Sequence, residues 1–178
     1  MAIEKPEYRV LAEVGGVEFR DYDPYWIAEC DFPNQQSLRE ASSRGFQYLF
    51  NYISGQNESA QKIAMTAPVQ QVPSGSGWAV SFVVPKSFYS GAIPVPANPA
   101  VRVRKVEGGL VAALRYRGNW DSVEFAGQAK ELAAVLTKLK VAVTGPFTSA
   151  VYNPPITPAF LRRNEVLVSV ANLPGSTR

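Results

Sequence analysis

One series of motifs occurs twice in this chain of 178 residues, and it restricts the possible folds more than any other feature. The segment KIAMTAPV at 62–69 is matched by KVAVTGPF at 140–147, and each comes directly after a stretch with helical spacing. Further upstream, RVLAEVGG at 9–16 is echoed by RVRKVEGG at 102–109. Because the order and the content of these blocks both repeat, we predict a duplicated α+β unit.

The predicted fold is an α+β domain in which the duplicated unit forms an antiparallel, distorted β-barrel or sheet flanked by two α-helices. We place its pseudo-repeats at about 8–85 and 101–170, within a single domain over 1–172, and treat 173–178 as a C-terminal tail. The length suits one well-buried domain. With 46% hydrophobic and 19% charged residues, the composition is that of a globular protein.

Two helices are predicted from their caps and their apolar spacing. Ser37, with Glu40 three residues later, forms a capping box at the start of the first helix, and Gly55 is expected to end it. Asp121 caps the second helix, with Glu124 at the reciprocal position. The apolar residues of the second helix form one stripe: Phe125, Ala129, Leu132, Leu136 and Leu139.

Short segments rich in β-formers predict the strands Tyr8–Val14, Val17–Tyr22, Tyr25–Asp31, Trp78–Pro85, Val101–Val106, Leu110–Arg117, Phe147–Tyr152 and Glu165–Val170. The pairs Gly15-Gly16 and Gly108-Gly109 are interpreted as hairpin turns. The repeated KxAxTxP segments are interpreted as strands that leave each helix and stop at Pro68 and Pro146, because proline cannot donate to a β-ladder.

Several classes of function are disfavoured by composition. The net charge of +3 is small and its basic residues are scattered among acids, so we expect no nucleic-acid partner. The N-terminal segment MAIEKPEYRV lacks the apolar run of a signal peptide, which predicts a soluble cytoplasmic protein. No uncharged stretch has the composition of a membrane-spanning helix. The chain has one cysteine and no histidine, so we predict no disulfide, no metal site and no catalytic residues.

Three blocks together carry a family resemblance: KIAMTAPV at 62–69, SLREA at 37–41, and YNPPITPAFLRRNEVLV at 152–168. In order and spacing the chain resembles the SOUL/haem-binding protein family over nearly its whole length. The resemblance implies a fold similar to GyrI-like effector-binding domains. It also implies that haem or another tetrapyrrole binds non-covalently in a shallow hydrophobic pocket between the first helix and the loop before the last strand, here Ser37–Ile53 and Asn153–Phe160.

The first helix has more apolar surface than one packing contact needs. Beside a stripe that suits close approach to a sheet, a second stripe about 100° away contains Arg39, Phe46, Phe50 and Ile53. A tetrapyrrole needs a wide apolar face and a cation for its propionates. We therefore expect the ligand to contact these residues together with Met65, Pro155, Ile156 and Phe160, with affinity nearer micromolar than nanomolar.

The missing histidine leaves the iron ligand open. Met65 and Cys30 are the candidate soft ligands, although a buried structural role suits either residue, and binding through the ring alone is the other possibility. The loop position at which a relative has lysine is Thr157, which removes one cation that could contact a propionate.

The main interpretation is a low-affinity carrier or buffer of a porphyrin-like molecule, and two alternatives stay open. One is a GyrI-like enzyme, such as a hydrolase, which would use a glutamate or tyrosine in its cavity; Glu124, Glu165, Tyr116 and Tyr152 are available. The other is a protein-interaction module without a small ligand, for which the surplus helix face is the interface. The block Arg162-Arg163-Asn164-Glu165 is interpreted either as an anion or partner site or as a salt-bridge network at the start of a strand.

Overall fold

A computed structural model describes residues 2–176, and the last two residues of the predicted tail lie outside this range. The described residues form two α-helices, α1 (Leu38–Ile53) and α2 (Ser122–Lys138). The strands are β1 (Tyr8–Val14), β2 (Val17–Tyr22), β3 (Tyr25–Phe32), β4 (Val69–Ser74), β5 (Gly77–Val83), β6 (Val101–Val106), β7 (Gly109–Tyr116), β8 (Thr148–Val151) and β9 (Asn164–Ser169). The α+β class is therefore confirmed.

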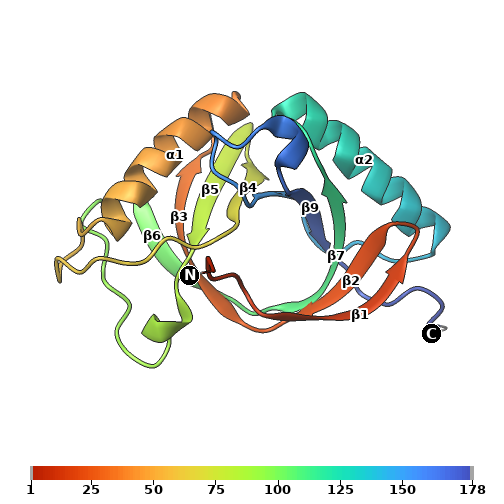
Figure 1. The fold of residues 1–178 in the computed structure, drawn as a ribbon, viewed down its shortest axis with the longest axis horizontal. Helices are drawn as coiled ribbons and strands as arrows, with labels where there is room; N and C mark the ends of the chain where they lie inside the picture. The colour runs from red at the N-terminus through yellow and green to blue at the C-terminus, as the bar shows by residue number, and fades with distance from the viewer. Residues whose placement is uncertain (1, 177–178) are drawn as a thin grey trace. The chain divides into compact units, whose positions relative to one another are not determined.

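The chain divides into two compact units. Unit 1 contains the residues up to Pro6 and Pro24–Glu107, and unit 2 contains Glu7–Asp23 and the residues from Gly108 onward. In unit 1 the antiparallel sheet has the order β4-β5-β3-β6, and α1 packs against β5, β3 and β6 (Figure 1). In unit 2 the order is β1-β2-β7-β9-β8, and α2 packs against β7 and β9.

Both predicted helix starts are confirmed by their caps. The Ser37 hydroxyl accepts a hydrogen bond from the Glu40 N–H at 3.2 Å. The Asp121 carboxylate accepts from the N–H groups of Val123 and Glu124 at 3.1 and 2.9 Å. These side chains satisfy backbone donors that have no partner within the first turn of a helix.

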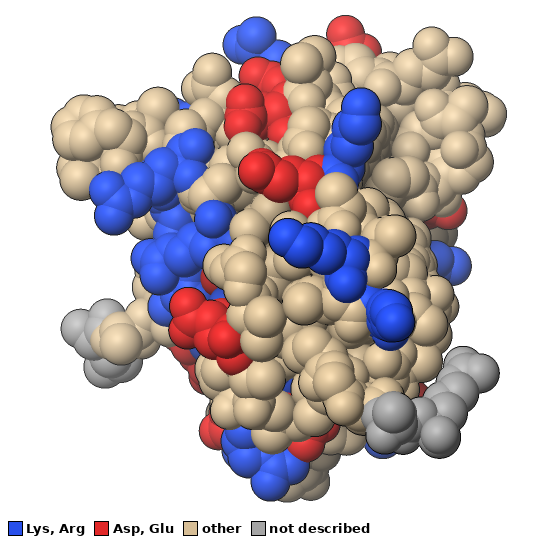
Figure 2. Space-filling model, turned by 90° about the vertical axis from the view of Figure 1, so that its right-hand side faces the viewer, with Lys and Arg blue, Asp and Glu red and all other residues tan. Residues whose placement is uncertain are grey.

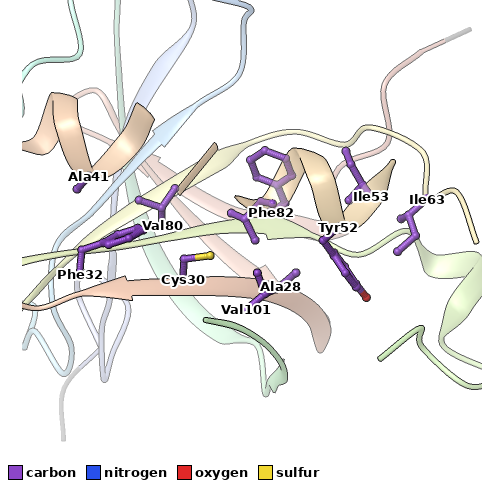
Figure 3. Close-up of a cluster of buried hydrophobic side chains, with 11 residues drawn as sticks. Ala28, Cys30, Phe32, Ala41, Tyr52, Ile53, Ile63, Val80, Phe82 and Val101 are labelled. Atoms are coloured by element: carbon purple, nitrogen blue, oxygen red, sulfur yellow. The ribbon is translucent and has the colours of Figure 1, made fainter. Parts of the chain in front are cut away.

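The core of unit 1 lies between α1 and one face of its sheet (Figure 3). Directly opposed residues of an antiparallel pair point to the same face, so Cys30 and its partner Val80 both face the helix. Gly45 of α1 lies so close to the sheet that a Cβ atom there would stand 2.7 Å from Val80 Cβ. The small residues in this stripe of α1 therefore set the distance between helix and sheet.

The second predicted hairpin is wrong. β6 pairs with β3 in unit 1, whereas β7 pairs with β2 and β9 in unit 2. Gly108 joins the two strands with a φ of +79°, and a Cβ atom at this position would lie 2.3 Å from the Tyr22 carbonyl oxygen. The glycine is thus needed for a positive φ and for close backbone approach beside β2, and the pair Gly108-Gly109 does not turn a hairpin.

The prediction that the KxAxTxP segments form strands is also wrong. Residues 62–67 run irregularly, apart from an isolated bridge between Glu4 and Thr66, and β4 begins only at Val69. In the second copy the ladder contact is a bridge between Val143 and Val170. The Thr66 hydroxyl donates to the Val83 carbonyl at 2.6 Å, so a side chain takes over the role that a ladder hydrogen bond would have played.

Neither helix in the described part of the chain is long and apolar enough to cross a membrane.

Candidate functional site

Two phenylalanines one turn apart form an exposed apolar surface on α1. Phe46 is 39% exposed and Phe50 is 44% exposed. Their ring centroids are 5.9 Å apart and their planes differ by 12°, so the rings stack nearly parallel. Phe46 also meets the edge of Phe82 on β5, with a centroid separation of 5.5 Å. We call Phe46 and Phe50, together with Met65, the aromatic surface.

Met65 is grouped with the two rings because its loop is tied to α1 and β5, the elements that carry Phe46, Phe50 and Phe82. Its side chain is 46% exposed. The Ile63 N–H donates to the Ile53 carbonyl at 2.8 Å, which ties the loop to the C-terminal end of α1. The hydroxyl of Thr66 ties the other side of the loop to Val83, the neighbour of Phe82 in β5. Met65 therefore lies between the end of α1 and the end of β5.

Arg39 and Ile53, the other two residues of α1 predicted to contact the ligand, differ in exposure. Arg39 is exposed in the first turn of the helix. It precedes Phe46 by about two turns, or ~10 Å along the axis, on nearly the same side of the helix. Ile53 is 6% exposed and packs in the core of unit 1 with Leu49 and Tyr52, so it adds almost nothing to the exposed surface.

The remaining predicted residues belong to unit 2. Pro155, Ile156 and Phe160 lie in the loop between β8 and β9. Ile156 is 92% exposed and Phe160 is 68% exposed, and Pro155 is also exposed. Because this loop and the aromatic surface belong to different units, each is described by itself.

Of the two candidate iron ligands, only Met65 is accessible. Cys30 is 1% exposed inside the core of unit 1, and burial, with a smaller contribution from Glu29, raises the pKa of its thiol to about 12. The thiol is therefore protonated at neutral pH and cannot serve as a thiolate ligand. Within the described residues, no group of three or more His, Cys, Asp or Glu side chains is placed to hold a metal ion.

Unit 2 contains a buried ion-pair cluster centred on Glu165. Its carboxylate accepts from the Arg20 guanidinium at 2.8 and 2.9 Å, from Arg163 at 2.8 and 3.1 Å, and from the Tyr152 hydroxyl at 2.8 Å. The Glu165 side chain is fully buried and that of Arg20 is 2% exposed. Burial alone would raise the pKa of Glu165, but the arginine contacts outweigh burial and lower the pKa to about 2.

Unit 1 contains a second carboxylate shared by two arginines. Glu29 on β3 is buried and accepts from Arg102 at 2.9 Å and from Arg104 at 2.9 Å, both on β6. Burial opposes ionisation of Glu29, yet the hydrogen bonds from the two arginines lower its pKa. By the sheet register, Glu29 points to the face opposite α1 because its neighbours Ala28 and Cys30 point toward the helix.

These clusters include charged residues that sequence reasoning did not single out as functional. Arg20 and Glu29 lie in the middle of predicted strands, where charge on a buried face is unusual. That position is the signal that could have found them. In the block 162–165, Arg163 forms a salt bridge with Glu165, as the salt-bridge interpretation expected, whereas Arg162 donates to the backbone carbonyls of Thr157 and Pro155.

The fold and the surface together describe an α+β protein whose first helix exposes two neighbouring aromatic rings and whose buried carboxylates Glu29 and Glu165 are each paired with arginines. The chain belongs to the SOUL heme-binding protein family, whose model matches residues 3–169. None of the curated proteins compared with the chain is significantly similar to it.

Solved structures show the same fold at low sequence identity. The EcmrR C-terminal domain has a TM-score of 0.66 at 8% identity, covering 93% of this chain and 99% of that chain. A hydrolase from Listeria innocua has a TM-score of 0.57 at 10% identity, covering 90% and 94%. EcmrR in a complex with DNA also matches, with a TM-score of 0.66 at 8% identity, covering 88% of this chain and 57% of that chain. At these identities the likeness establishes the fold alone.

The expectation that the chain binds no nucleic acid stays a prediction. On the face shown in Figure 2, lysine and arginine side chains form several separate groups, and aspartate and glutamate side chains lie next to some of them. A nucleic-acid interface would instead gather basic residues in one patch or stripe.

Proposed function

We propose that this protein binds haem or a similar flat, amphipathic tetrapyrrole on the aromatic surface of α1, and that it carries or buffers the ligand without transforming it. The observation that carries the proposal is the nearly parallel, half-exposed pair of rings, Phe46 and Phe50. Such a pair offers exposed aromatic surface against which a macrocycle can pack. Membership of a heme-binding family supports the same class of ligand.

Arg39 is proposed to contact a propionate. A guanidinium is the side chain best suited to a carboxylate, and Arg39 is exposed about two turns from the rings. The contact is expected to be weak because the arginine is accessible to water. Pro155, Ile156 and Phe160 remain predicted ligand contacts on the strength of the resemblance.

Binding is proposed not to depend on iron. The chain has no histidine, and Cys30 is enclosed and protonated. Met65 is the accessible sulfur, and a thioether can bind haem iron weakly. Because the apolar face of the ring would supply most of the affinity, metal-free protoporphyrin should bind about as well as hemin.

A carrier is favoured over an enzyme by the state of the acidic groups. Glu165 is ionised, fully buried and already accepts hydrogen bonds from three side chains, so it has little capacity to take a proton from a substrate at neutral pH. Burial raises the pKa of Tyr116 to about 12, which keeps that hydroxyl neutral. Glu124 accepts a hydrogen bond from Gln128, one turn later in α2, at 2.9 Å.

The proposal is tested by titrating the purified protein with hemin, protoporphyrin IX and protoporphyrin dimethyl ester. Phe46→Ala and Phe50→Ala are each expected to weaken all three ligands about tenfold, the equivalent of losing one half-buried ring contact. Arg39→Gln should weaken the two dicarboxylate ligands about two- to fivefold and leave the ester unchanged. The matched control is Val95→Ala, which truncates another exposed apolar side chain of unit 1.

Several results would overturn the proposal. Affinity weaker than about 100 μM for every porphyrin, or ~5.5 kcal/mol, would remove the carrier function. Equal losses of porphyrin affinity in Val95→Ala and Phe50→Ala would show that the loss in Phe50→Ala does not come from a direct contact with its ring. A low-spin haem spectrum that disappears in Met65→Ala would show that iron ligation, and not contact with the rings of Phe46 and Phe50, holds the ligand.

A further inference from the structure

Three buried polar atoms of unit 2 have no hydrogen-bond partner among the described residues. They are the hydroxyl oxygens of Tyr116 and Ser149 and the amide oxygen Oδ1 of Asn164. Tyr116 is 8% exposed, and the other two residues are fully buried. A buried polar atom without a partner is uncommon, because it has given up its bonds to water and gained none within the protein. Three such atoms in one unit indicate a partner of another kind.

The three residues occupy neighbouring positions on one face of the sheet. Tyr116 on β7 is directly opposite Asn164 on β9, and Asn164 is directly opposite Val151 on β8. Opposed residues of an antiparallel pair point to the same face, and so do residues two apart on one strand, such as Ser149 and Val151. We call Tyr116, Asn164 and Ser149 the polar triad.

The polar triad lies on the face of β9 opposite the buried ion-pair cluster. Glu165 directly follows Asn164 in β9, so its carboxylate points to the other face and cannot supply the missing bonds. Burial raises the pKa of the Tyr116 hydroxyl to about 12, and Glu124 and Asp121 add smaller contributions. The hydroxyl is therefore neutral and lies near the first turn of α2, the helix that packs against β7 and β9.

The orientation of the Asn164 amide is set by its other end. Its Nδ2 atom donates to the Gly118 carbonyl at 3.0 Å, so the unpaired atom is the oxygen, which can only accept. The hydroxyls of Tyr116 and Ser149 are possible donors, yet neither lies within hydrogen-bond distance of this oxygen. A water molecule joins polar atoms up to ~6 Å apart, because each of its two bonds is ~2.7–3.2 Å long.

We propose that the polar triad binds ordered water beneath the first turn of α2. One water molecule donates to Asn164 Oδ1 and accepts from the Tyr116 hydroxyl, and the Ser149 hydroxyl bonds to this molecule or to a second one connected to it. Buried water typically makes about three hydrogen bonds to polar groups that have no other partner, which is the number that the triad offers. The site is separate from the aromatic surface, which belongs to unit 1.

Water suits the polar triad better than an ion does. The three oxygen atoms are neutral, whereas hard cations are usually held with the help of carboxylates. The two nearest acids are engaged elsewhere, since Asp121 caps α2 and Glu124 accepts a hydrogen bond from Gln128. An anion would face the acceptor Oδ1 of Asn164 and the charges of the same two acids. Water both donates and accepts, as this set of atoms requires.

The variant Tyr116→Phe tests the proposal through the sign of its effect on stability. If water binds the hydroxyl, its removal breaks a hydrogen bond and should raise the equilibrium constant of unfolding about two- to tenfold. If the hydroxyl were buried without any partner, its removal would stabilise the fold and lower this constant. Ser149→Ala should act in the same direction as Tyr116→Phe, and both are measured by urea unfolding of the ligand-free protein.

Tyr52→Phe is the matched control. Tyr52 is also buried, burial raises its pKa to about 12 as well, and its hydroxyl donates to the Pro94 carbonyl at 2.6 Å. Its loss measures the effect of one buried tyrosine hydrogen bond in this protein. The double variant Tyr116→Phe/Ser149→Ala should raise the unfolding constant by less than the product of the two single effects, because the two hydroxyls share the water. Tyr116→Phe/Tyr52→Phe should give the full product.

A high-resolution crystal structure of the ligand-free protein gives the direct readout. We expect a water molecule ~2.7–3.2 Å from both Asn164 Oδ1 and the Tyr116 hydroxyl. A dry site, a metal ion in that place, a gain of stability in Tyr116→Phe, or fully multiplicative effects of Tyr116→Phe and Ser149→Ala would each overturn the proposal. Since no porphyrin is present in these measurements, their outcome is independent of the proposed ligand binding.

Discussion

Removing the charge of Glu165 should destabilise the protein severely while leaving its shape almost unchanged. In Glu165→Gln, the buried guanidinium of Arg20 loses its charged partner, and Arg163 loses the same carboxylate. Arg20 then keeps the Glu18 carboxylate, whose side chain is 36% exposed, and the neutral Tyr22 hydroxyl at 3.1 Å. A buried charge that loses its ion-pair partner lowers the free energy of unfolding by more than most single substitutions do.

The buried ion pair sets the magnitude of the loss, and the lowered pKa of Glu165, which arises from the same contacts, agrees with it. Breaking a buried ion pair by removing one partner costs about 3–5 kcal/mol. The pKa of Glu165 falls from the ordinary value of 4.5 to about 2. At ~1.36 kcal/mol for each pKa unit, this difference corresponds to about 3 kcal/mol of folding free energy. For a domain of this length, such a loss would lower the Tm by roughly 6–20 °C.

The assay is equilibrium unfolding in urea, with Glu18→Gln as the matched control. Glu18 binds the same guanidinium, at 2.8 Å, but its carboxylate is partly hydrated. Glu18→Gln should therefore lower the free energy of unfolding by less than about 1 kcal/mol. A cost for Glu165→Gln that equals the cost for Glu18→Gln would refute the claim that the buried cluster stabilises unit 2.

The lowered pKa of Glu165 also predicts how the stability of the fold depends on pH. A carboxyl group with a lowered folded-state pKa stabilises the fold above its unfolded pKa, and this contribution is lost as the pH falls toward the folded pKa. The contribution of Glu165 should thus be complete above about pH 5 and decline between about pH 5 and pH 2. Wild type and Glu165→Gln should converge in stability over that interval, and a constant difference would contradict the assignment.

Two further predictions concern the core of unit 1. Gly45→Ala should destabilise the fold by about 1–3 kcal/mol in urea unfolding, although alanine is the better helix former, because the new Cβ would lie 2.7 Å from Val80 Cβ; an increase in stability would show that α1 can move away from the sheet. Cys30 should not react with a thiol reagent at pH 8 until denaturant is added, because it is 1% exposed and burial raises its pKa to about 12; prompt labelling of the native protein would contradict this packing.

Much of the local structure was predictable because local chemistry determines it. Ser37 and Asp121 are caps whose side chains satisfy their own helix, so short sequence patterns suffice to place both helix starts. The strand partners were not predictable in the same way. Gly108 has the appearance of a hairpin turn in the sequence, yet its φ and its closeness to the Tyr22 carbonyl serve a connection between strands of different units.

The candidate site was predictable in part for a similar reason. The helical spacing of Phe46 and Phe50 identifies a second apolar stripe on α1, and both rings are exposed. Ile53 lies on that stripe by spacing but is buried, because the loop after α1 folds back over the helix end and its Ile63 N–H binds the Ile53 carbonyl. A local pattern cannot show which end of a stripe a distant loop will cover. A local pattern cannot identify the ion-pair partner of Arg20 either, because Glu165 is 145 residues away in the chain.

The most direct test of the proposed ligand surface is the methyl resonance of Met65 during titration with metal-free protoporphyrin IX. The chain has two methionines, Met1 and Met65, so methyl-labelled methionine gives two signals that are easily assigned by substitution. A porphyrin lying on the aromatic surface would shift the Met65 methyl upfield through its ring current, with the same Kd as the optical titration. A Met65 signal that stays unchanged at saturating porphyrin would contradict the central claim that the ligand binds on this surface.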